Sequence, residues 1–436
     1  MRCWSACVRI ERRRLADPPA LAREVRRLVP AAADVTEAVA AIVADVRDRG
    51  DPALLEYTAR LDVAGHRLRV EADELARAEA GLSGDVRAGL EIAVANVAQV
   101  ANAWVEEERE VVLGQGHRVR LREVPVGSAA VYVPGGRAPY PSTVVMGVVT
   151  ARAAGVEDVV VCSPPPVADV LLGACGLCGV STVYRMGGAQ AVAALAHGTQ
   201  TVAPVDVIVG PGNLYVQEAK RLVCDRVGID GFAGPSDLLV IFDADDLGSL
   251  RLIALDLIAQ AEHGPQSLVI AAAADPDLLD RLAAEVEQFA AARPLADPAA
   301  CVLVEAASLA DALAFSDVYA PEHLELIGPG AEALAPDVRC AGCVFVGWPS
   351  GTAFGDYVSG SNHVLPTGGS ARFASGLSPR HFRRRMAEVS IPPQAVAALA
   401  GAGAPIARAE GFAVHAESMT ARVPVAPPAA AGAPDA

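Results

Sequence analysis

The chain has 436 residues, of which 52% are hydrophobic and 20% are charged, and its formal net charge is −16. These values are typical of a globular protein of roughly three domains and argue against a disordered chain. The negative charge argues against nucleic acid or an anionic membrane surface as a partner, because both need a basic face. The sequence has neither an apolar run long enough to span a bilayer nor the apolar stretch of a signal peptide, so we expect a soluble, cytoplasmic protein.

The pattern along the chain is first helical and then alternating. Apolar residues recur at helical spacing over Val35–Arg49 and over Leu90–Val105, within a mostly helical stretch from residue 20 to residue 110. From Val124, short β-branched runs alternate with glycine turns and helices. The expected strands are residues 131–133, 158–162, 182–184, 205–209, 238–242, 267–273, 301–304 and 343–346. This alternation predicts an α/β protein with two Rossmann-like parallel-sheet lobes.

Cysteine spacing raises the question of a structural metal. The chain has nine cysteines, including the Cys-x-x-Cys pairs Cys175/Cys178 and Cys340/Cys343. The two pairs could together form a zinc site. They are far apart in sequence, and each lies in an apolar stretch rich in alanine and glycine, which favours buried structural thiols.

Glycine loops follow two of the expected strands. The dinucleotide fingerprint G-x-G-x-x-G is absent after any strand. Glycines at Gly187-Gly188 and at Gly210-x-Gly212 would still let the backbone approach a ligand at a helix N-terminus. Tight turn packing explains these glycines equally well.

Several polar side chains have the chemistry of metal ligands. On the helix-like segment 256–264, Gln260 and His263 share a face, with Asp256 one turn earlier, although a polar helix end before a glycine would look the same. Asp356 and His363 lie on a glycine-rich loop. Glu410 and His415 are five apart and would not share a helical face. Asp, Gln and His form a nitrogen and oxygen ligand set suited to zinc.

An adjacent carboxylate and imidazole, Glu322–His323, are the two side chains best suited to moving protons near neutral pH. Pro321 precedes them, and we expect it to bias Ala320 toward an extended backbone. Two different bases suggest two proton transfers. Taken alone, the pair could also be an incidental feature of a surface loop.

Together these segments resemble the motifs of histidinol dehydrogenase. They follow the family's order from about residue 30 to about residue 422 and are long and specific. The similar segments are VYVPGGRAPYPSTVVM at 131–146, GGAQAVAALAHGT at 187–199, VGPGNLYV at 209–216, AGPSDLLV at 233–240, QAEHG at 260–264, APEHLEL at 320–326, GDYVSGSNHVLPT at 355–367 and EGFAVH at 410–415.

The resemblance implies an enzyme that oxidises L-histidinol through L-histidinal to L-histidine with two NAD⁺, in the last steps of histidine biosynthesis. It also implies one Zn²⁺ per subunit, which anchors the substrate and carries no redox electrons. The residues matching zinc ligands are Gln260, His263, Asp356 and His415. Those matching further substrate contacts are Ser236, His323, His363 and Glu410, and those matching NAD contacts are Tyr132, Gln190 and Asn213.

The resemblance further implies a homodimer in which Glu410 and His415 complete the partner's site. The chain would then divide into an N-terminal helical segment, a discontinuous first lobe with most zinc and catalytic residues, a second lobe with the NAD contacts, an extension exchanged in the dimer, and a disordered tail. The expected bounds are 1–24, 25–131 with 237–380, 132–236, 381–424 and 425–436.

Within this reaction the pair Glu322–His323 has two distinct uses. His323 fits the base that takes the hydroxyl proton while hydride leaves to NAD⁺. Glu322 fits the base that activates a water for the oxidation of the aldehyde.

Three positions depart from the family's usual residues: Val207 replaces lysine, Asp237 replaces glutamate and Phe242 replaces alanine. We expect the first two near the cleft, where they would affect substrate or cofactor preference. The leading alternative is therefore a relative that oxidises another amino alcohol or a sulfonated diol. A non-catalytic zinc-binding or assembly protein is a further alternative, which the intact Glu322 and His323 disfavour.

Overall fold

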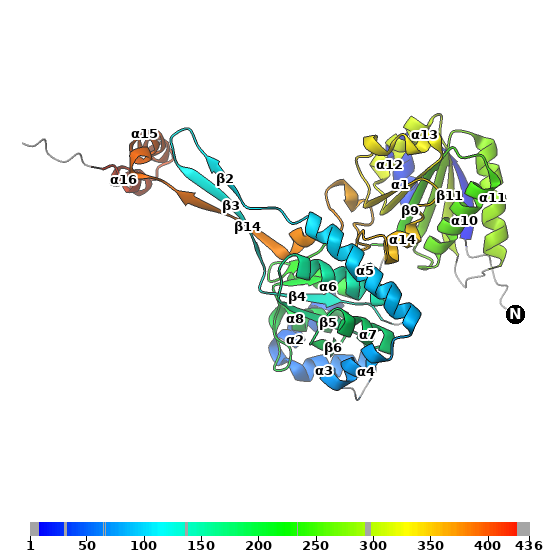
Figure 1. Cartoon of the computed structure of the whole chain (residues 1–436), viewed down its shortest axis with the longest axis horizontal. Coiled ribbons are helices and arrows are strands. Elements are labelled where there is room, and N and C mark those ends of the chain that lie inside the picture. Colours follow the sequence, from blue (N-terminus) through cyan, green and yellow to red (C-terminus); the bar gives the residue numbers. More distant parts are fainter. Residues whose placement is uncertain are drawn as a thin grey trace, which may run out of the picture. The chain divides into compact units, whose positions relative to one another are not determined.

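The computed structural model describes residues 8–29, 33–63, 65, 67–135, 138–232, 234–292 and 298–424. The chain divides into two compact units, one of Met1–Val105 with Val126–Phe382 and one of Glu106–Pro125 with Arg383–Ala436. The first unit contains two parallel sheets covered by helices, and the second contains a small antiparallel sheet and two helices (Figure 1). The predicted α/β class with two Rossmann-like lobes is confirmed. In the described part of the chain, no helix is both long and apolar enough to cross a membrane.

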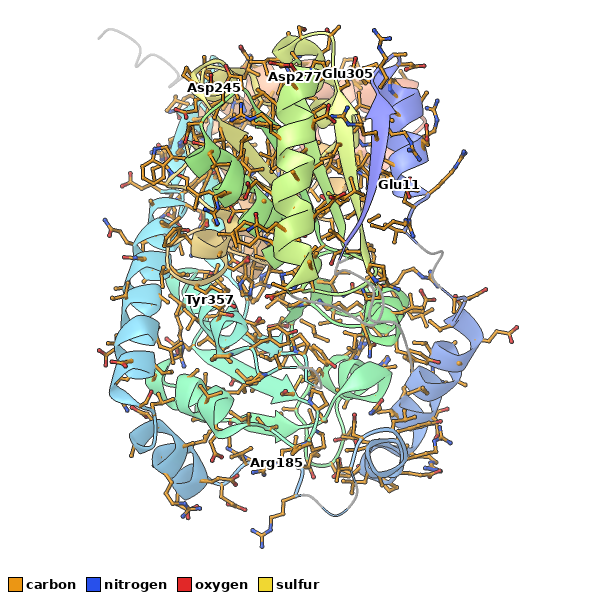
Figure 2. The ribbon with its side chains drawn as sticks, turned by 90° about the vertical axis from the view of Figure 1, so that its right-hand side faces the viewer. Glu11, Arg185, Asp245, Asp277, Glu305 and Tyr357 are labelled. Carbon is orange, nitrogen blue, oxygen red and sulfur yellow. The ribbon has the colours of Figure 1, made fainter. Side chains whose placement is uncertain are left out.

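The larger sheet has six strands, and its neighbours all pair in parallel. In spatial order they are β1 (Val8–Arg14), β11 (Ala299–Glu305), β10 (Leu268–Ala273), β9 (Asp237–Phe242), β12 (His323–Ile327) and β13 (Cys343–Val346). Helices α10 (Leu247–Ala261) and α11 (Pro276–Ala291) cover one face, and α1 (Pro18–Arg26) and α12 (Leu309–Tyr319) cover the other. Figure 2 shows β1, which carries the labelled Glu11, as the outer strand. Strands β9 and β10 are buried on both faces, which explains the apolar run after Asp237 in β9 and the wholly apolar sequence of β10.

The smaller parallel sheet has five strands. In spatial order they are β6 (Val183–Arg185), β5 (Asp158–Ser163), β4 (Ser128–Tyr132), β7 (Val207–Val209) and β8 (Gly228–Ile229). One face packs against α2 (Thr36–Arg49), α8 (Gly188–His197) and α9 (Leu214–Val223), and the other against α5 (Gly84–Ala103), α6 (Pro141–Ala153) and α7 (Asp169–Leu177). Helices α3 (Asp51–Leu61) and α4 (Ala72–Ala80) pack outside, on α2 with α8 and on α7 respectively.

Short helices connect the remaining segments of the first unit. They are α13 (Pro329–Glu332), α14 (Thr352–Tyr357) and three 3₁₀ turns at Ala335–Asp337, Ser370–Arg372 and Pro379–Phe382. Several helices begin at capping side chains, such as Asp246 before α10 and Ser308 before α12. Each such cap binds a free N–H of the first turn and is worth about 1 kcal/mol.

The second unit joins two segments that are far apart in sequence. Strands β14 (Arg383–Ser390), β3 (Arg118–Pro125) and β2 (Arg109–Val112) form an antiparallel sheet in that order. Helices α15 (Pro393–Ala409) and α16 (Ala413–Thr420) pack on each other through Ala404, Ala407 and Ala416. The small alanine side chains allow the two helices to approach closely.

The observed architecture differs from the expected division of the chain. Val8–Arg14 is an edge strand of the larger sheet and not part of a helical segment, because its backbone pairs with β11. The helices between residues 36 and 103 cover the smaller sheet, where their apolar faces share its core, and not the larger one. Residues 106–125 belong with the C-terminal extension, since β3 pairs with β14. The predicted tail at 425–436 lies outside the described residues.

Candidate active site

The pair Glu322–His323 lies at the amino ends of the central strands of the larger sheet. His323 is the first residue of β12 and pairs in register with Leu238 of β9 and Cys343 of β13. Both Glu322 and His323 are buried, so the explanation as an exposed loop fails. The predicted extended backbone at Ala320 is wrong: this residue has a φ of 51° and ends α12 in the left-handed conformation. That sharp turn carries the chain from the helix directly into the strand.

Glu322 and Asp237 are held together by reciprocal hydrogen bonds. The backbone N–H of Asp237 donates to Glu322 Oε2 at 3.0 Å, and the N–H of Glu322 donates to Asp237 Oδ1 at 2.7 Å. Burial and the charge of Asp237 raise the pKa of Glu322 well above its usual value, and burial raises the pKa of Asp237 to about 6. Burial and the neighbouring carboxylate therefore both disfavour the charged form of Glu322.

His323 is a neutral base with a fixed tautomer. Its Nδ1 lies 3.3 Å from the backbone oxygen of Asp237, which can only accept, so Nδ1 carries the hydrogen and Nε2 keeps its lone pair. Nε2 faces Asp356, whose Oδ1 lies 3.8 Å away. Burial lowers the pKa of His323 to about 4, because desolvation penalises the charged imidazolium. The ring of Phe345, 6.0 Å away between centroids, contributes to this apolar environment.

His363 connects the two lobes of the first unit. Its Nδ1 lies 2.9 Å from the backbone oxygen of Asp356, and its Nε2 lies 3.1 Å from the hydroxyl of Thr143 on α6. By the same argument Nδ1 donates and Nε2 accepts the hydroxyl proton of Thr143. Asn362 adds a second link by donating to the backbone oxygen of Met146 at 3.1 Å. Sequence reasoning did not identify Thr143, because a threonine in an apolar helix carries no pattern of its own.

The predicted zinc ligands are only partly brought together. Gln260 is buried in the last turn of α10, and its side-chain nitrogen has no hydrogen-bond partner. His263 follows the end of this helix and is close enough to His323 and His363 for its charge to lower the pKa of both. Asp356 lies on α14, which packs against α10, and burial raises its pKa to about 6. Within the described residues, no three His, Cys, Asp or Glu side chains gather to hold a metal ion.

A zinc ion fits the donors that this region offers. An amide oxygen, an imidazole nitrogen and a carboxylate are suitable ligands, and Gln260, His263 and Asp356 leave at least one position to be supplied from elsewhere. His415 and Glu410 lie in the second compact unit. His415 is exposed on α16 with its ring 5.2 Å from that of Phe412, and Glu410 is exposed at the end of α15.

Two other candidate metal groups are not assembled. Asp256 does not join Gln260 and His263; its carboxylate lies beside Gly351 at the start of α14. The pairs Cys175/Cys178 and Cys340/Cys343 belong to the smaller and the larger sheet respectively, and all four thiols are free. Cys175 is buried, as the interpretation as a structural thiol requires, whereas Cys178, Cys340 and Cys343 are half-buried.

The predicted NAD contacts lie at the carboxyl end of the smaller sheet. The phenol oxygen of Tyr132, the last residue of β4, accepts the N–H of Gly188 at 3.1 Å. Gln190 in the first turn of α8 is buried and donates to Asp62 at 3.4 Å, while its carbonyl oxygen has no partner. Asn213 caps α9 by accepting from the N–H groups of Tyr215 and Val216. The strand order reverses between β4 and β7, and such a switch point is where open α/β sheets bind ligands.

The positions that depart from the family pattern have different surroundings. Asp237 lies in the site, against Glu322. Val207 is the first residue of β7 and is buried in the core at the amino end, away from Tyr132 and Gly210 at the carboxyl ends, so the expectation that it lines the cleft is wrong. Phe242 is fully buried in the core of the larger sheet. Ser236, which precedes β9, is half-buried and bonds the side chain of Glu322.

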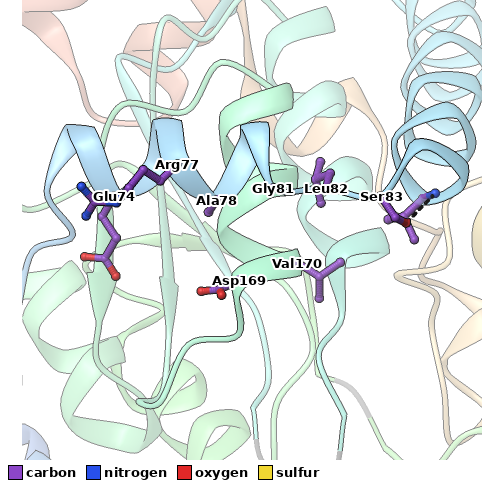
Figure 3. Close-up of a pocket in the computed structure, with 9 residues that line it drawn as sticks. Glu74, Arg77, Ala78, Gly81, Leu82, Ser83, Asp169 and Val170 are labelled. Carbon is purple, nitrogen blue, oxygen red and sulfur yellow. Dashed lines mark hydrogen bonds between the residues drawn. The ribbon is translucent and has the colours of Figure 1, made fainter.

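A separate hollow of about 510 Å³ lies between α4, α7 and the start of α5 (Figure 3). It is lined by Glu74, Arg77, Ala78, Gly81, Leu82, Ser83, Val86, Asp169 and Val170. None of the predicted site residues lines it. Because Glu74 is paired with Arg185 and none of these residues has a buried polar atom without a partner, we attach no chemistry to it.

Comparisons with known proteins agree on one family. The model of the family described as histidinol dehydrogenase matches residues 26–423. The histidinol dehydrogenase of Gluconobacter oxydans is 41% identical over 403 residues, which cover 89% of this chain and 93% of that protein. That of Escherichia coli is 40% identical and covers 96% of both. A crystal structure of histidinol dehydrogenase from Elizabethkingia anophelis matches with a TM-score of 0.88 at 30% identity, covering 96% of this chain and 98% of that one.

Proposed function

Because the chain belongs to the histidinol dehydrogenase family, we propose that it oxidises L-histidinol to L-histidinal and then to L-histidine, with reduction of two NAD⁺. The pathway would be histidine biosynthesis. The observation that carries this proposal is the buried pair Glu322–His323, in which burial keeps the imidazole neutral and raises the pKa of the neighbouring carboxyl group. Two consecutive oxidations at one carbon need two such groups.

In the first oxidation, His323 would accept the hydroxyl proton at Nε2 while the carbon gives a hydride to the nicotinamide ring. The products are the aldehyde, NADH and one proton. The backbone oxygen of Asp237 holds the other ring nitrogen, so the base keeps its orientation as it becomes charged. His363, fixed by Thr143 and by the backbone of Asp356, would orient the substrate, with Ser236 and Glu410 as further contacts.

In the second oxidation a water adds to the aldehyde carbon, and the hydrate loses a hydride to a second NAD⁺. Glu322 would take the proton of this water, which requires its carboxylate form. Burial and the charge of Asp237 disfavour the carboxylate form of Glu322. A positive charge close to Glu322 would favour that form. The step yields the carboxylate, NADH and two protons.

We propose that Gln260, His263 and Asp356 hold a Zn²⁺ ion, one per subunit, together with His415 of the partner subunit. When bound, the ion would act as a Lewis acid that anchors the imidazole and amino nitrogens of the substrate. The buried position of Gln260 and the largely buried carboxylate of Asp356 support this assignment. Tyr132, Gln190 and Asn213 would contact the NAD⁺.

A homodimer follows from the same proposal. The second unit exposes apolar side chains, among them Val112, Ile406, Phe412 and Val414. Such a surface on a small unit is typical of a protein interface. We therefore propose that this unit docks on a second copy and supplies Glu410 and His415 to it.

The test is the yield of NADH from L-histidinol in the presence of NAD⁺ and Zn²⁺. Two NADH per substrate consumed would support the proposal, and one NADH with accumulating aldehyde would remove the second oxidation. The alternative of a different alcohol is favoured by Asp237, where glutamate is usual, because this residue touches the proposed base. Parallel assays with other amino alcohols and sulfonated diols decide between them. If no alcohol gave NADH, the result would favour the alternative of a non-catalytic zinc-binding or assembly protein.

A further inference from the structure

Lys220 is the only lysine in the sequence, in which 36 residues are lysine or arginine. It is also among the largest fully buried side chains, with 1% of its surface exposed. A charged side chain is buried this deeply only when it is paired and hydrogen-bonded. All the remaining residues of this group of 36 are arginine. The lysine at position 220 therefore indicates a specific requirement for an ammonium group there.

The partners of Lys220 enclose a single glycine. Lys220 Nζ donates to the backbone oxygen of Gly210 at 2.6 Å and to Asp230 Oδ1 at 2.6 Å. The other carboxylate oxygen, Asp230 Oδ2, accepts the N–H of Gly210 at 2.6 Å. One buried ion pair thus binds both polar backbone atoms of Gly210. The guanidinium of arginine is larger and planar and could not place a point charge between the same two oxygens.

Gly210 begins the loop at the carboxyl end of β7. Its φ is +111°, and a Cβ there would lie 2.1 Å from the backbone oxygen of Tyr132, so only glycine fits. The loop ends at Asn213, which caps α9. Lys220 is on the same helix, seven residues and about two turns later, so it lies on the side of Asn213. The loop is therefore fixed at both ends by α9.

We propose that Lys220, together with Asp230, is a positioning residue for the dinucleotide. It holds the backbone of Gly210–Asn213 against Tyr132, so that the loop is formed before NAD⁺ arrives and the cofactor does not bear the entropic cost of ordering it. This inference rests on the proposed NAD contacts of Tyr132 and Asn213. It assigns to Lys220 an effect on cofactor binding without direct contact.

A purely structural ion pair would stabilise the sheet without any effect on the cofactor. The same strands provide a matched control for this possibility. At their amino ends, Asp206 Oδ2 accepts the N–H groups of Gly127 and Ser128 at 2.8 and 3.0 Å. Asp206 is thus another carboxylate that ties β7 to β4, at the end that binds no cofactor in the proposed function.

The first experiment compares Lys220→Met and Lys220→Arg with Asp206→Ala, at a temperature where all are folded. Loss of a charged hydrogen bond to the loop should raise the KM for NAD⁺ about tenfold or more. The KM for histidinol should stay within about twofold, and Asp206→Ala should lower only the melting temperature. The proposal is overturned if the Lys220 variants keep the wild-type KM for NAD⁺, or if Asp206→Ala raises it equally.

A second experiment needs no substitution, in case the Lys220 variants do not fold. Lysine labelled with ¹³C at the ε carbon gives one protein side-chain resonance, because the chain has one lysine. Saturating NAD⁺ without histidinol should shift this resonance, and an unchanged resonance would overturn the proposal. Wild-type enzyme that fails to oxidise histidinol would refute the proposed function instead, and the two failures are thereby distinguished.

Discussion

Glu322 and His323 are neighbours in one buried environment, and their pKa values are shifted in opposite directions. Burial lowers the pKa of His323 to about 4 and raises that of Glu322 well above its usual value. The cause is the same, since the charged form of an imidazole is protonated and that of a carboxyl group is not. In the proposed reaction the neutral His323 can therefore accept the proton of the alcohol, whereas burial disfavours the carboxylate form that Glu322 needs. This difference fits an order in which the alcohol is oxidised before the aldehyde.

The first prediction separates the two residues. His323→Gln should slow histidinol oxidation about 10²- to 10⁴-fold, the range for loss of a general base. Glu322→Gln should mainly slow oxidation of histidinal, since its proposed role begins with the hydrated aldehyde. Rates measured with each substrate supplied separately check the assignment. Equal losses on both substrates in both variants would contradict it.

The second prediction concerns Asp237, whose charge raises the pKa of Glu322. Asp237→Asn removes that charge and keeps the oxygen that accepts the N–H of Glu322. The pKa of Glu322 should fall, so the acidic limb of the pH profile for histidinal oxidation should move to lower pH. Because the pKa of Asp237 is about 6, the wild type should show the extra repulsion only above about that pH.

Profiles of kcat/KM against pH for histidinal, taken side by side, measure this shift. The alcohol step is the internal control, because His323 is held by the backbone oxygen of residue 237, which the substitution leaves in place. An acidic limb that moves to higher pH, or moves equally for both substrates, would show that Asp237 does not act through its charge on Glu322.

At the scale of elements, sequence patterns predicted strands made of apolar residues and missed strands that contain several ionisable residues. β10 and all of β9 after Asp237 are apolar, and both strands were predicted to within a residue or two. β12 was missed although it carries His323, because its sequence HLELI buries two ionisable side chains where the pattern expects apolar ones. β1 was missed because VRIERRR is an arginine-rich edge strand. Pairing partners, and not local sequence, decide both cases.

Helix α14 shows how packing between elements places a site residue. Glu325 of β12 accepts the N–H of Thr352 at 2.9 Å, which fixes the start of the helix on the sheet. Asp356 follows one turn later and faces His323. Between them, Gly355 passes directly over the ring of Phe345. The sequence identified Asp356 as a candidate ligand but gave no sign of the contacts with Glu325 and Phe345 that aim it.

The third prediction is that Gly355→Ala displaces α14. The added Cβ would lie 2.5 Å from Phe345 Cζ, so the helix or the ring must move. Overpacking of this kind costs about 1–3 kcal/mol of stability. Since Asp356 moves with the helix, bound zinc measured by elemental analysis and kcat for histidinol should both fall, with the KM for NAD⁺ unchanged. Gly89→Ala on α5 is the matched control, because a Cβ there meets no atom within 4 Å; similar losses in both variants would contradict the argument.

At the scale of the whole chain, the two parallel sheets have the same strand order once the added edge strand β1 is set aside, and their candidate site residues lie at opposite ends. In the smaller sheet the candidate cofactor residues lie at the carboxyl ends. In the larger sheet the equivalent place is filled by Asp243, which accepts the N–H groups of Gly330 and Ala331 at 2.9 and 3.1 Å. The candidate catalytic residues of the larger sheet lie at the amino ends of its strands instead. The alternation of strands and helices predicted two lobes, but it could not show at which end of each sheet the candidate site residues lie.

The division of the chain was harder to predict because sequence neighbours serve different parts. Residues 8–14 join the larger sheet, residues 36–103 cover the smaller one, and residues 118–125 pair with β14 at residues 383–390. Amphipathic helices show which of their faces is buried but not which sheet buries it. The motifs could suggest candidate site residues because residue chemistry is local, whereas the grouping of elements depends on contacts between distant segments.

The last prediction tests whether active sites are shared between subunits. Glu322→Ala and His415→Ala lie in different compact units of the chain. If His415 serves the partner's site, a mixed dimer of these two inactive variants contains one site with both changes and one with neither. Random exchange of equal amounts makes half of the dimers mixed, so activity should recover to about one quarter of wild type. Mixing Glu322→Ala with His263→Ala should recover nothing, because every site would then keep one damaged first unit. Recovery in that control, or none in the test after exchange is verified by mass spectrometry, would contradict sharing through the second unit.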